Sequence, residues 1–129
     1  MDSNKLIFEQ VAEMVENQIL DGLLKENDQS PSTTEFANTY GINPATARKG
    51  LNILVDEGIL YKKRGMGMYV TDKAIDIIKE KRRQEYLDNI LPDLIKNIKL
   101  LGISKDELIK EIQDIYKKED MDDWGKKFK

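Results

Sequence analysis

Residues 41–67 predict a helix followed by a short hairpin, and this stretch constrains the fold more than any other part of the chain. Asn43 is a good N-cap, and Pro44 suits the first helical turn because the N–H that proline lacks has no partner there. Gly58 stands where a left-handed residue would end the helix. Two β-prone runs then flank a Gly-x-Gly turn at residues 65–67, which indicates a wing.

Two further helices are predicted before this stretch. Residues 6–24 carry apolar side chains at helical spacing with acidic residues between them. Ser32 and Glu35 form a capping box that opens the second helix. A tight connection at residues 41–42 joins it to the helix at 44–57, as in a helix-turn-helix. The fold class is therefore mainly α with a small β wing, and residues 1–71 are predicted to form an N-terminal winged helix-turn-helix DNA-binding domain.

Residues 72–129 are predicted to be a C-terminal pair of dimerising helices. Pro92 removes the N–H that would bond to Asp88, so the helix should kink or restart there. Ser104 and Glu107 form a second capping box, and the helix that follows should run to about Lys118. Two helices alone bury too little apolar surface, so pairing with a second copy is favoured. The candidate dimerisation residues are Leu87, Leu91, Leu94, Ile98, Leu101, Leu108, Ile112 and Ile115.

Charge is distributed unevenly along the chain, although the net charge is only −3. Residues 1–40 carry two basic and eight acidic residues, whereas residues 41–83 carry ten basic and five acidic ones. Residues 84–129 carry nine basic and eleven acidic residues. The positive charge thus lies where the predicted helix and wing lie, which is what a phosphate backbone would sense.

The exposed side of the predicted helix at 44–57 suits a DNA groove. Ala45 is small enough for close approach, Thr46 can hydrogen-bond or touch a thymine methyl, and Arg48 can reach guanine or phosphate. A solvated helix face is the alternative for any Arg-Lys pair such as residues 48–49. Met66 at the wing tip could enter a minor groove or pack on the hairpin. The preceding turn and the basic wing favour duplex DNA as the partner.

The chain resembles the GntR family of bacterial transcription regulators, through several landmarks in the family's order. These are Phe8-Glu9-Gln10-Val11-Ala12, Ser30-Pro31-Ser32, Phe36-Ala37, Tyr40-Gly41-Ile42-Asn43, Thr46, Arg48, Leu51, Leu54, Glu57-Gly58-Ile59-Leu60 and Gly65-x-Gly67. The resemblance implies a homodimer that binds a palindromic double-stranded operator, usually as a repressor. The short region after the wing is similar to that of the YtrA-type branch, which implies a dimerising helical pair and leaves room for a small-molecule effector.

By position, the resemblance gives Thr46 and Arg48 the DNA-contacting roles and the glycines the wing tip. Together with the residue chemistry it defines the candidate DNA-binding residues: Ser32, Thr34, Asn43, Ala45, Thr46, Arg48, Lys49, Lys62, Lys63, Arg64, Gly65, Met66 and Gly67. Three of the family's common contacts are absent. The family commonly has Arg at the position of Thr34, Arg or Lys at that of Met66, and a basic or polar residue at that of Pro44. The operator should therefore differ, or affinity should depend more on Lys49 and the basic residues at 62–64.

A winged-helix protein-interaction module without specific DNA binding is the alternative function, with residues 41–83 facing an acidic partner. An enzyme is not expected, since no nucleophile constellation or phosphate loop is present. With neither cysteine nor histidine, the sequence offers no catalytic thiol or imidazole and no usual transition-metal site, so no cofactor is expected. No apolar run has membrane-spanning length and no signal peptide is evident, so a cytoplasmic location without membrane contact is expected.

Overall fold

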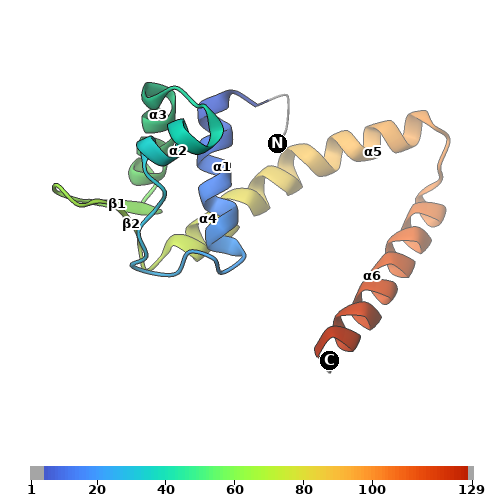
Figure 1. The fold of residues 1–129 in the computed structure, drawn as a ribbon. Coiled ribbons are helices and arrows are strands. Elements are labelled where there is room, and N and C mark those ends of the chain that lie inside the picture. Colours follow the sequence, from blue (N-terminus) through green and yellow to red (C-terminus); the bar gives the residue numbers. More distant parts are fainter. Residues whose placement is uncertain (1–4, 128–129) are drawn as a thin grey trace. The chain divides into compact units, whose positions relative to one another are not determined.

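The computed structural model describes residues 5–127, and the side chains of residues 5–120. It is mostly helical, with one antiparallel two-stranded sheet (Figure 1). The elements are α1 (Ile7–Leu20), α2 (Thr33–Tyr40), α3 (Pro44–Asp56), β1 (Leu60–Lys63), β2 (Gly67–Val70), α4 (Ala74–Glu85), the π-helical segment η1 (Tyr86–Ile90), α5 (Leu91–Leu100) and α6 (Lys105–Lys127). The chain divides into two compact units, one ending at Arg83 and the other beginning at Gln84.

Local signals set the helix ends in the first unit. The Ser32 hydroxyl accepts a hydrogen bond from the Glu35 backbone N–H at 3.1 Å, and the Asn43 side chain accepts one from Ala45 N–H at 2.8 Å. Both N-caps were predicted from the sequence, and both are confirmed. Gly58 follows α3 with a φ of +81°, so the left-handed residue predicted to end this helix is also confirmed.

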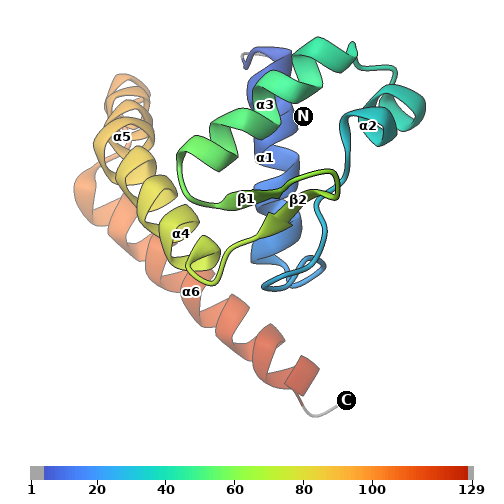
Figure 2. The ribbon, with the colours of Figure 1, turned by 90° about the vertical axis from the view of Figure 1, so that its left-hand side faces the viewer.

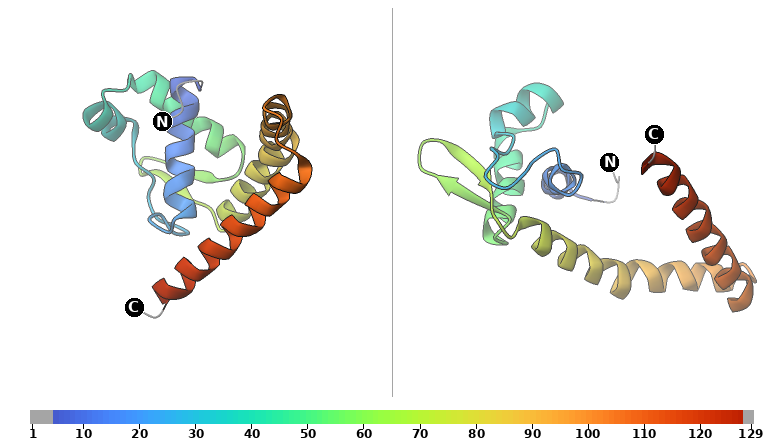
Figure 3. Two further views of the ribbon diagram at one scale, coloured as in Figure 1. Left: turned by 90° about the vertical axis from the view of Figure 1, so that its right-hand side faces the viewer. Right: turned by 90° about the horizontal axis from the view of Figure 1, so that it is seen from below.

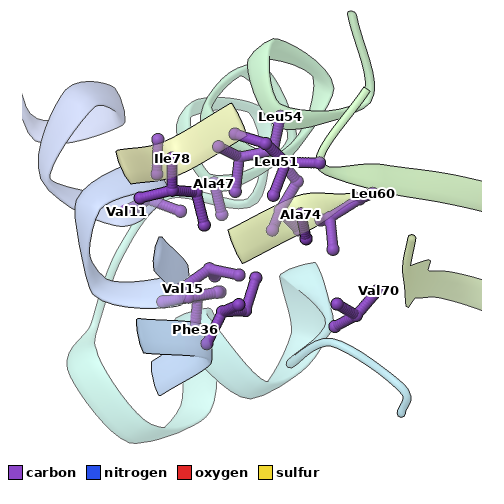
Figure 4. Close-up of a cluster of buried hydrophobic side chains, with 13 residues drawn as sticks. Val11, Val15, Phe36, Ala47, Leu51, Leu54, Leu60, Val70, Ala74 and Ile78 are labelled. Atoms are coloured by element: carbon purple, nitrogen blue, oxygen red, sulfur yellow. The ribbon is translucent and has the colours of Figure 1, made fainter. Parts of the chain in front are cut away.

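A single apolar core holds the helices and the wing of this unit together (Figure 4). α1 contributes one side of it and α3 the other, and the strands close it through Leu60 and Val70, which pair across the hairpin. The fully or nearly fully buried members are Val11, Ala12, Val15, Ile19, Phe36, Ala47, Leu51, Leu54, Ile59, Leu60, Val70, Ala74 and Ile78. The hairpin is thereby anchored at its base, while its turn projects away from the helices of its unit (Figure 3).

Gly50 allows α1 and α3 to cross at close range. A Cβ at this position would lie 2.5 Å from the Phe8 carbonyl oxygen and 2.9 Å from the Val11 Cβ. Neither atom can be turned aside by a rotamer change, because one is backbone and the other is attached directly to it. The helix crossing therefore requires glycine in the interior of α3, where its conformational freedom otherwise costs stability.

We expect Gly50→Ala to lower the free energy of unfolding by about 1–2 kcal/mol. Alanine gains about 1 kcal/mol in helix propensity, but overpacking against a fixed backbone costs up to about 3 kcal/mol, so the clash outweighs the gain. Urea denaturation monitored by circular dichroism measures the change. Asp56→Ala, at the exposed end of the same helix, is the control and should stay within about 0.5 kcal/mol of the parent. Equal or greater stability for Gly50→Ala would show that the two helices do not meet this closely.

The loop before α2 acts as a partial third strand for the wing. Asn27 N–H donates to the Val70 carbonyl at 2.8 Å, Val70 N–H donates to the Asp28 carbonyl at 3.0 Å, and Ser30 N–H donates to the Met68 carbonyl at 2.9 Å. Gln29 also forms an isolated antiparallel bridge with Tyr69. The sequence did not predict this pairing. It supports a hairpin that, with two strands alone, would be marginally stable.

The first turns of α4 pack on the winged core, so this compact unit extends past residue 71, where the sequence placed the end of the DNA-binding domain. Ala74 and Ile78 are buried in the core. Farther along α4, the Lys81 ammonium contacts both Glu16 of α1 and Glu57 at the end of α3, and Arg82 Nη2 lies 3.1 Å from Glu16 Oε1. The two cations therefore link α4 to α1, and Lys81 also links it to the end of α3.

Glu16→Gln should lower the free energy of unfolding by about 1–2 kcal/mol. The Glu16 side chain is only 5% exposed, whereas those of Lys81 and Arg82 are 38% and 27% exposed. The loss should therefore be smaller than the 3–5 kcal/mol typical of a fully buried broken pair, because water can rehydrate the cations. Chemical denaturation measures it. Glu13→Gln, which breaks the surface pair with Lys5 on the same helix, should cost less. An equal loss at both positions would contradict a structural role for the buried pair.

The second unit is helical, with a π-helical turn before Pro92. η1 covers Tyr86–Ile90, and α5 begins at Leu91 with the proline in its first turn. The helix does not restart at Pro92, because Glu85, Ile90 and Leu91 all keep right-handed helical angles. The interruption is this π turn, whose wider winding avoids the hydrogen bond that Pro92 cannot donate. The Ser104 hydroxyl caps α6 by accepting from Glu107 N–H at 3.1 Å. α6 runs to Lys127, so the predicted end near Lys118 is wrong.

Candidate nucleic-acid interface

The N-terminal half of α3 presents its predicted DNA-binding side chains to solvent. Ala47, Leu51 and Leu54 face the core, which leaves the other side of the helix open. Asn43, Ala45 and Arg48 are exposed, and Thr46 is half-buried. Asn43 already uses its side-chain oxygen to cap the helix. An exposed helix terminus with a small residue, a hydroxyl and a guanidinium is the form in which recognition helices enter a major groove.

Lys49 lies apart from this set. Its ammonium stands over the Phe8 ring of α1, with Nζ 4.1 Å from the ring centroid. A cation–π contact at an exposed site contributes about 0.5–1 kcal/mol, which is enough to favour this orientation over a free side chain. The neighbouring Arg48 is directed toward the wing instead, where it lines a hollow with Lys62. The two adjacent basic residues therefore lie on different surfaces, Lys49 over α1 and Arg48 in the hollow beside the wing.

The wing separates its basic residues between its two faces. The register pairs Tyr61 with Tyr69 and Lys62 with Met68, and side chains alternate along each strand. Lys62 thus shares a face with Leu60, Met68 and Val70, toward α3. On the opposite face, Lys63 Nζ lies 4.4 Å from the Tyr69 ring centroid, beside the stacked Tyr61.

The wing tip is open to solvent. Arg64 and Gly65 are exposed, and Met66 is 61% exposed, so the methionine does not pack on the hairpin. Gly65 and Gly67 adopt φ values of +74° and +99°, which allow the tight turn. An exposed apolar side chain at the end of a basic hairpin has the form that reaches into a minor groove.

A hollow of about 250 Å³ is lined by residues from three segments of the chain. The backbone of these segments is drawn in Figure 2. It is lined by the loop that enters α2, by one side of α3 and by the wing face that carries Lys62. The lining residues are Gln29, Ser30, Pro31, Ser32, Thr33, Arg48, Leu51, Asn52, Lys62, Gly67 and Met68. Of the predicted DNA-binding residues, it gathers Ser32, Arg48, Lys62 and Gly67. Thr34 is exposed in the first turn of α2 and does not line it.

Gln29 and Asn52 were absent from the predicted DNA-binding set. Asn52 lines this hollow one helical turn after Arg48, and its Oδ1 atom is buried without a hydrogen-bond partner. That spacing places the two side chains on one face of α3, which is a signal the sequence offered. Gln29 carried no such signal, because its contacts are to residues of the wing about forty positions later.

The surface contains two exposed cations from different segments and no acidic side chain among the residues that line the hollow. The N-terminus of α2 also opens onto it at Ser32 and Thr33. Backbone N–H groups of a helix start and two cations together attract an anion such as a phosphate. Within residues 5–120, whose side chains the structure describes, no group of three or more acidic residues could hold a metal ion. None of the helices between residues 5 and 127 combines the length and the apolar character that a membrane span requires.

Comparison with known proteins agrees with this geometry. The family model for bacterial regulatory proteins of the gntR family matches residues 7–70. The repressor YtrA of Bacillus subtilis is 29% identical over 113 residues, which are 88% of this chain and 86% of YtrA. A regulator of this family from Bacteroides thetaiotaomicron is 25% identical, with a TM-score of 0.71 over 88% of this chain and 99% of that one. BusR of S. agalactiae, solved in complex with its busAB-promotor DNA, is 28% identical, with a TM-score of 0.56 over 88% of this chain and 57% of BusR.

Proposed function

The chain belongs to the GntR family of bacterial regulatory proteins, and on that premise we propose that it represses transcription by binding a palindromic operator as a homodimer. It is a DNA-binding transcription regulator and not an enzyme. Repression is inferred from YtrA, which is named a transcriptional repressor and matches most of both chains. Such a protein acts where the chromosome lies, so we place it in the cytoplasm.

The hollow between α2, α3 and the wing is the observation that carries the proposal. It is lined by Arg48, Lys62 and the start of α2, and Arg48 also belongs to the open N-terminal half of α3. With α3 in a major groove, Ala45, Thr46 and Arg48 would meet base edges, while Ser32 and Lys62 would meet phosphates. Arg64 and Met66 at the wing tip would meet the adjacent minor groove. BusR, which shares this fold, is solved on promoter DNA.

The apolar side chains of the second unit support the homodimer. Within residues 84–120, none of the large apolar side chains is buried. Leu87, Leu91, Leu94, Leu101, Ile112 and Ile115 are between 42% and 75% exposed, and Ile98 and Leu108 are half-buried. A row of exposed leucine and isoleucine side chains on two helices marks an interaction surface. We propose that a second copy covers it and that the pair then reads two half-sites related by symmetry.

A hollow of about 590 Å³ along α5 is the place in this unit where an effector would be sought. It is lined by Leu91, Pro92, Ile95, Lys96, Lys99 and Leu100, all from one helix. A single helix cannot enclose the 70–90% of a ligand's surface that small-molecule sites bury. We therefore propose that any effector site on this groove is completed by residues from outside α5.

Selection of bound sequences from random duplex DNA tests the proposed function. The full chain should enrich one sequence that contains an inverted repeat, because each subunit would read one half-site. Enrichment of an unrepeated sequence would contradict the homodimeric operator. Retention of DNA without any enriched sequence, or no retention at low salt, would favour the protein-interaction module instead.

A further inference from the structure

The carbonyl of Met66, at the wing tip, is held by two side chains. Gln29 Nε2 donates a hydrogen bond to this oxygen at 3.1 Å, and the Tyr69 hydroxyl donates a second one, also at 3.1 Å. Tyr69 belongs to the hairpin itself, whereas Gln29 comes from the loop that leads into α2. Gln29 is therefore a link between the wing tip and the part of the molecule that packs on the recognition helix.

Backbone pairing alone does not reach the wing tip. The ladder between the loop and β2 ends where Ser30 N–H donates to the Met68 carbonyl at 2.9 Å. The Gln29 side chain continues the contact from there to Met66, along the edge of the hollow that contains Arg48 and Lys62. Without it, the turn at residues 64–66 would be held only by hydrogen bonds within the hairpin.

Gly67 makes room for this link. A Cβ on Gly67 would lie 2.8 Å from Gln29 Nε2, and the φ of +99° is itself a conformation that side chains rarely adopt. A larger residue would strain the turn and displace the glutamine amide from the Met66 carbonyl. The second glycine of the Gly-x-Gly turn thus serves both the hairpin and the approach of Gln29.

We propose that Gln29 is a positioning residue for DNA binding, which holds the wing tip in the geometry that meets the duplex. This inference rests on the proposed function. Gln29 acts by positioning Arg64 and Met66, the exposed residues of the tip, and not by contacting a DNA base itself. Holding the tip before DNA arrives removes an ordering cost that would otherwise be subtracted from the binding free energy.

The expected effect follows from the strength of one exposed hydrogen bond. Its loss lets the tip leave its bound geometry for part of the time, and the apparent Kd rises in inverse proportion to the competent fraction. We expect Gln29→Met, which keeps the length of the side chain but removes the donor, to weaken operator binding by about 2- to 10-fold. The thermal midpoint should not change, because the side chain is exposed.

The test compares Gln29→Met with Gln10→Met in the full chain. The Gln10 amide also donates to a backbone carbonyl, that of Lys5 at 2.9 Å, but this bond lies at the start of α1 and does not involve the wing. Amide hydrogen exchange at residues 65–67 is measured without DNA, and affinity is measured on the sequence recovered by selection. Each is repeated in an Arg64→Ala background, in which the tip has lost its cation.

In Gln29→Met, exchange at residues 65–67 should accelerate, and the affinity loss should shrink in the Arg64→Ala background. Gln10→Met should change neither quantity. Unchanged exchange at the tip would overturn the inference, and so would an equal affinity loss with and without Arg64. If the parent protein shows no sequence preference, the proposed function falls, while the exchange measurement still decides whether Gln29 holds the wing.

Discussion

Replacing Leu94 by aspartate should turn the homodimer into monomers and weaken operator binding by at least about 100-fold. Leu94 is 52% exposed on α5 and lies in the middle of the proposed subunit contact. A carboxylate there would have to be desolvated against leucine and isoleucine side chains, which costs several kcal/mol without a partner charge. Monomers would bind each half-site separately and lose the gain in effective concentration that linkage provides.

Light scattering and a binding titration on the recovered operator measure the two effects. Leu100→Asp is the matched control, since it makes the same substitution on the same helix at a residue that is 77% exposed. Leu100 lies about 120° around the helix axis from Leu94, away from the predicted seam. It should leave the mass and affinity nearly unchanged. A Leu94→Asp protein that still has the mass of a dimer would show that α5 does not carry the contact.

Arg48→Ala should weaken binding to the operator by about 5- to 150-fold, equivalent to about 1–3 kcal/mol, while affinity for unrelated duplex DNA falls much less. Arg48 is exposed and lines the hollow beside Lys62, where its guanidinium can reach a guanine edge or a phosphate. Because the Arg48 side chain is exposed, its removal should leave the free energy of unfolding within about 0.5 kcal/mol of the parent.

Lys49→Ala supplies the control at the neighbouring position. Because the Lys49 ammonium lies over Phe8, we expect its removal to have a smaller effect than that of Arg48, and one that is similar for every DNA sequence. Competition titrations with operator and scrambled duplexes separate the two outcomes. A larger loss of sequence preference for Lys49→Ala than for Arg48→Ala would reverse the assignment of the two residues on α3.

Much of the first unit could be predicted because its signals are local. Ser32 and Asn43 each cap the helix that begins next to them. α3 ends at Asp56, one residue before its predicted end, and Gly58 follows it in the predicted left-handed conformation. The hairpin follows from a turn of three residues between two β-prone runs. Each of these helix ends and turns depends on residues that are close together in the chain, so it can be predicted from one sequence.

Other parts of the site depend on partners that are distant in the chain. Gln29 meets the wing 37 residues later, and Glu16 meets Arg82 66 residues later. Without knowledge of those partners, an acidic residue in a helix and a glutamine in a loop would both be predicted to be exposed surface residues. The placement of Lys62 and Lys63 on opposite faces of the wing is different, because side chains alternate along a strand and the sequence alone implied it. The prediction missed it because it treated the adjacent basic residues as one group.

The second unit shows where helical periodicity misleads. The π turn at Tyr86–Ile90 changes the rotation per residue, so the position of Leu87 in the seam does not follow from α-helical spacing with Leu91 and Leu94. α6 continues to Lys127 although charged residues follow Lys118, because lysine and glutamate are themselves good helix formers.

The most direct test of the account is the ratio of affinities for the recovered inverted repeat and for a scrambled duplex of the same composition, measured as salt is raised. We expect the repeat to bind at least about 1,000-fold more tightly at physiological salt, with the logarithm of both affinities falling linearly as the logarithm of salt rises. Equal affinity for the two duplexes at every salt concentration would contradict sequence-specific regulation by α3 and the wing.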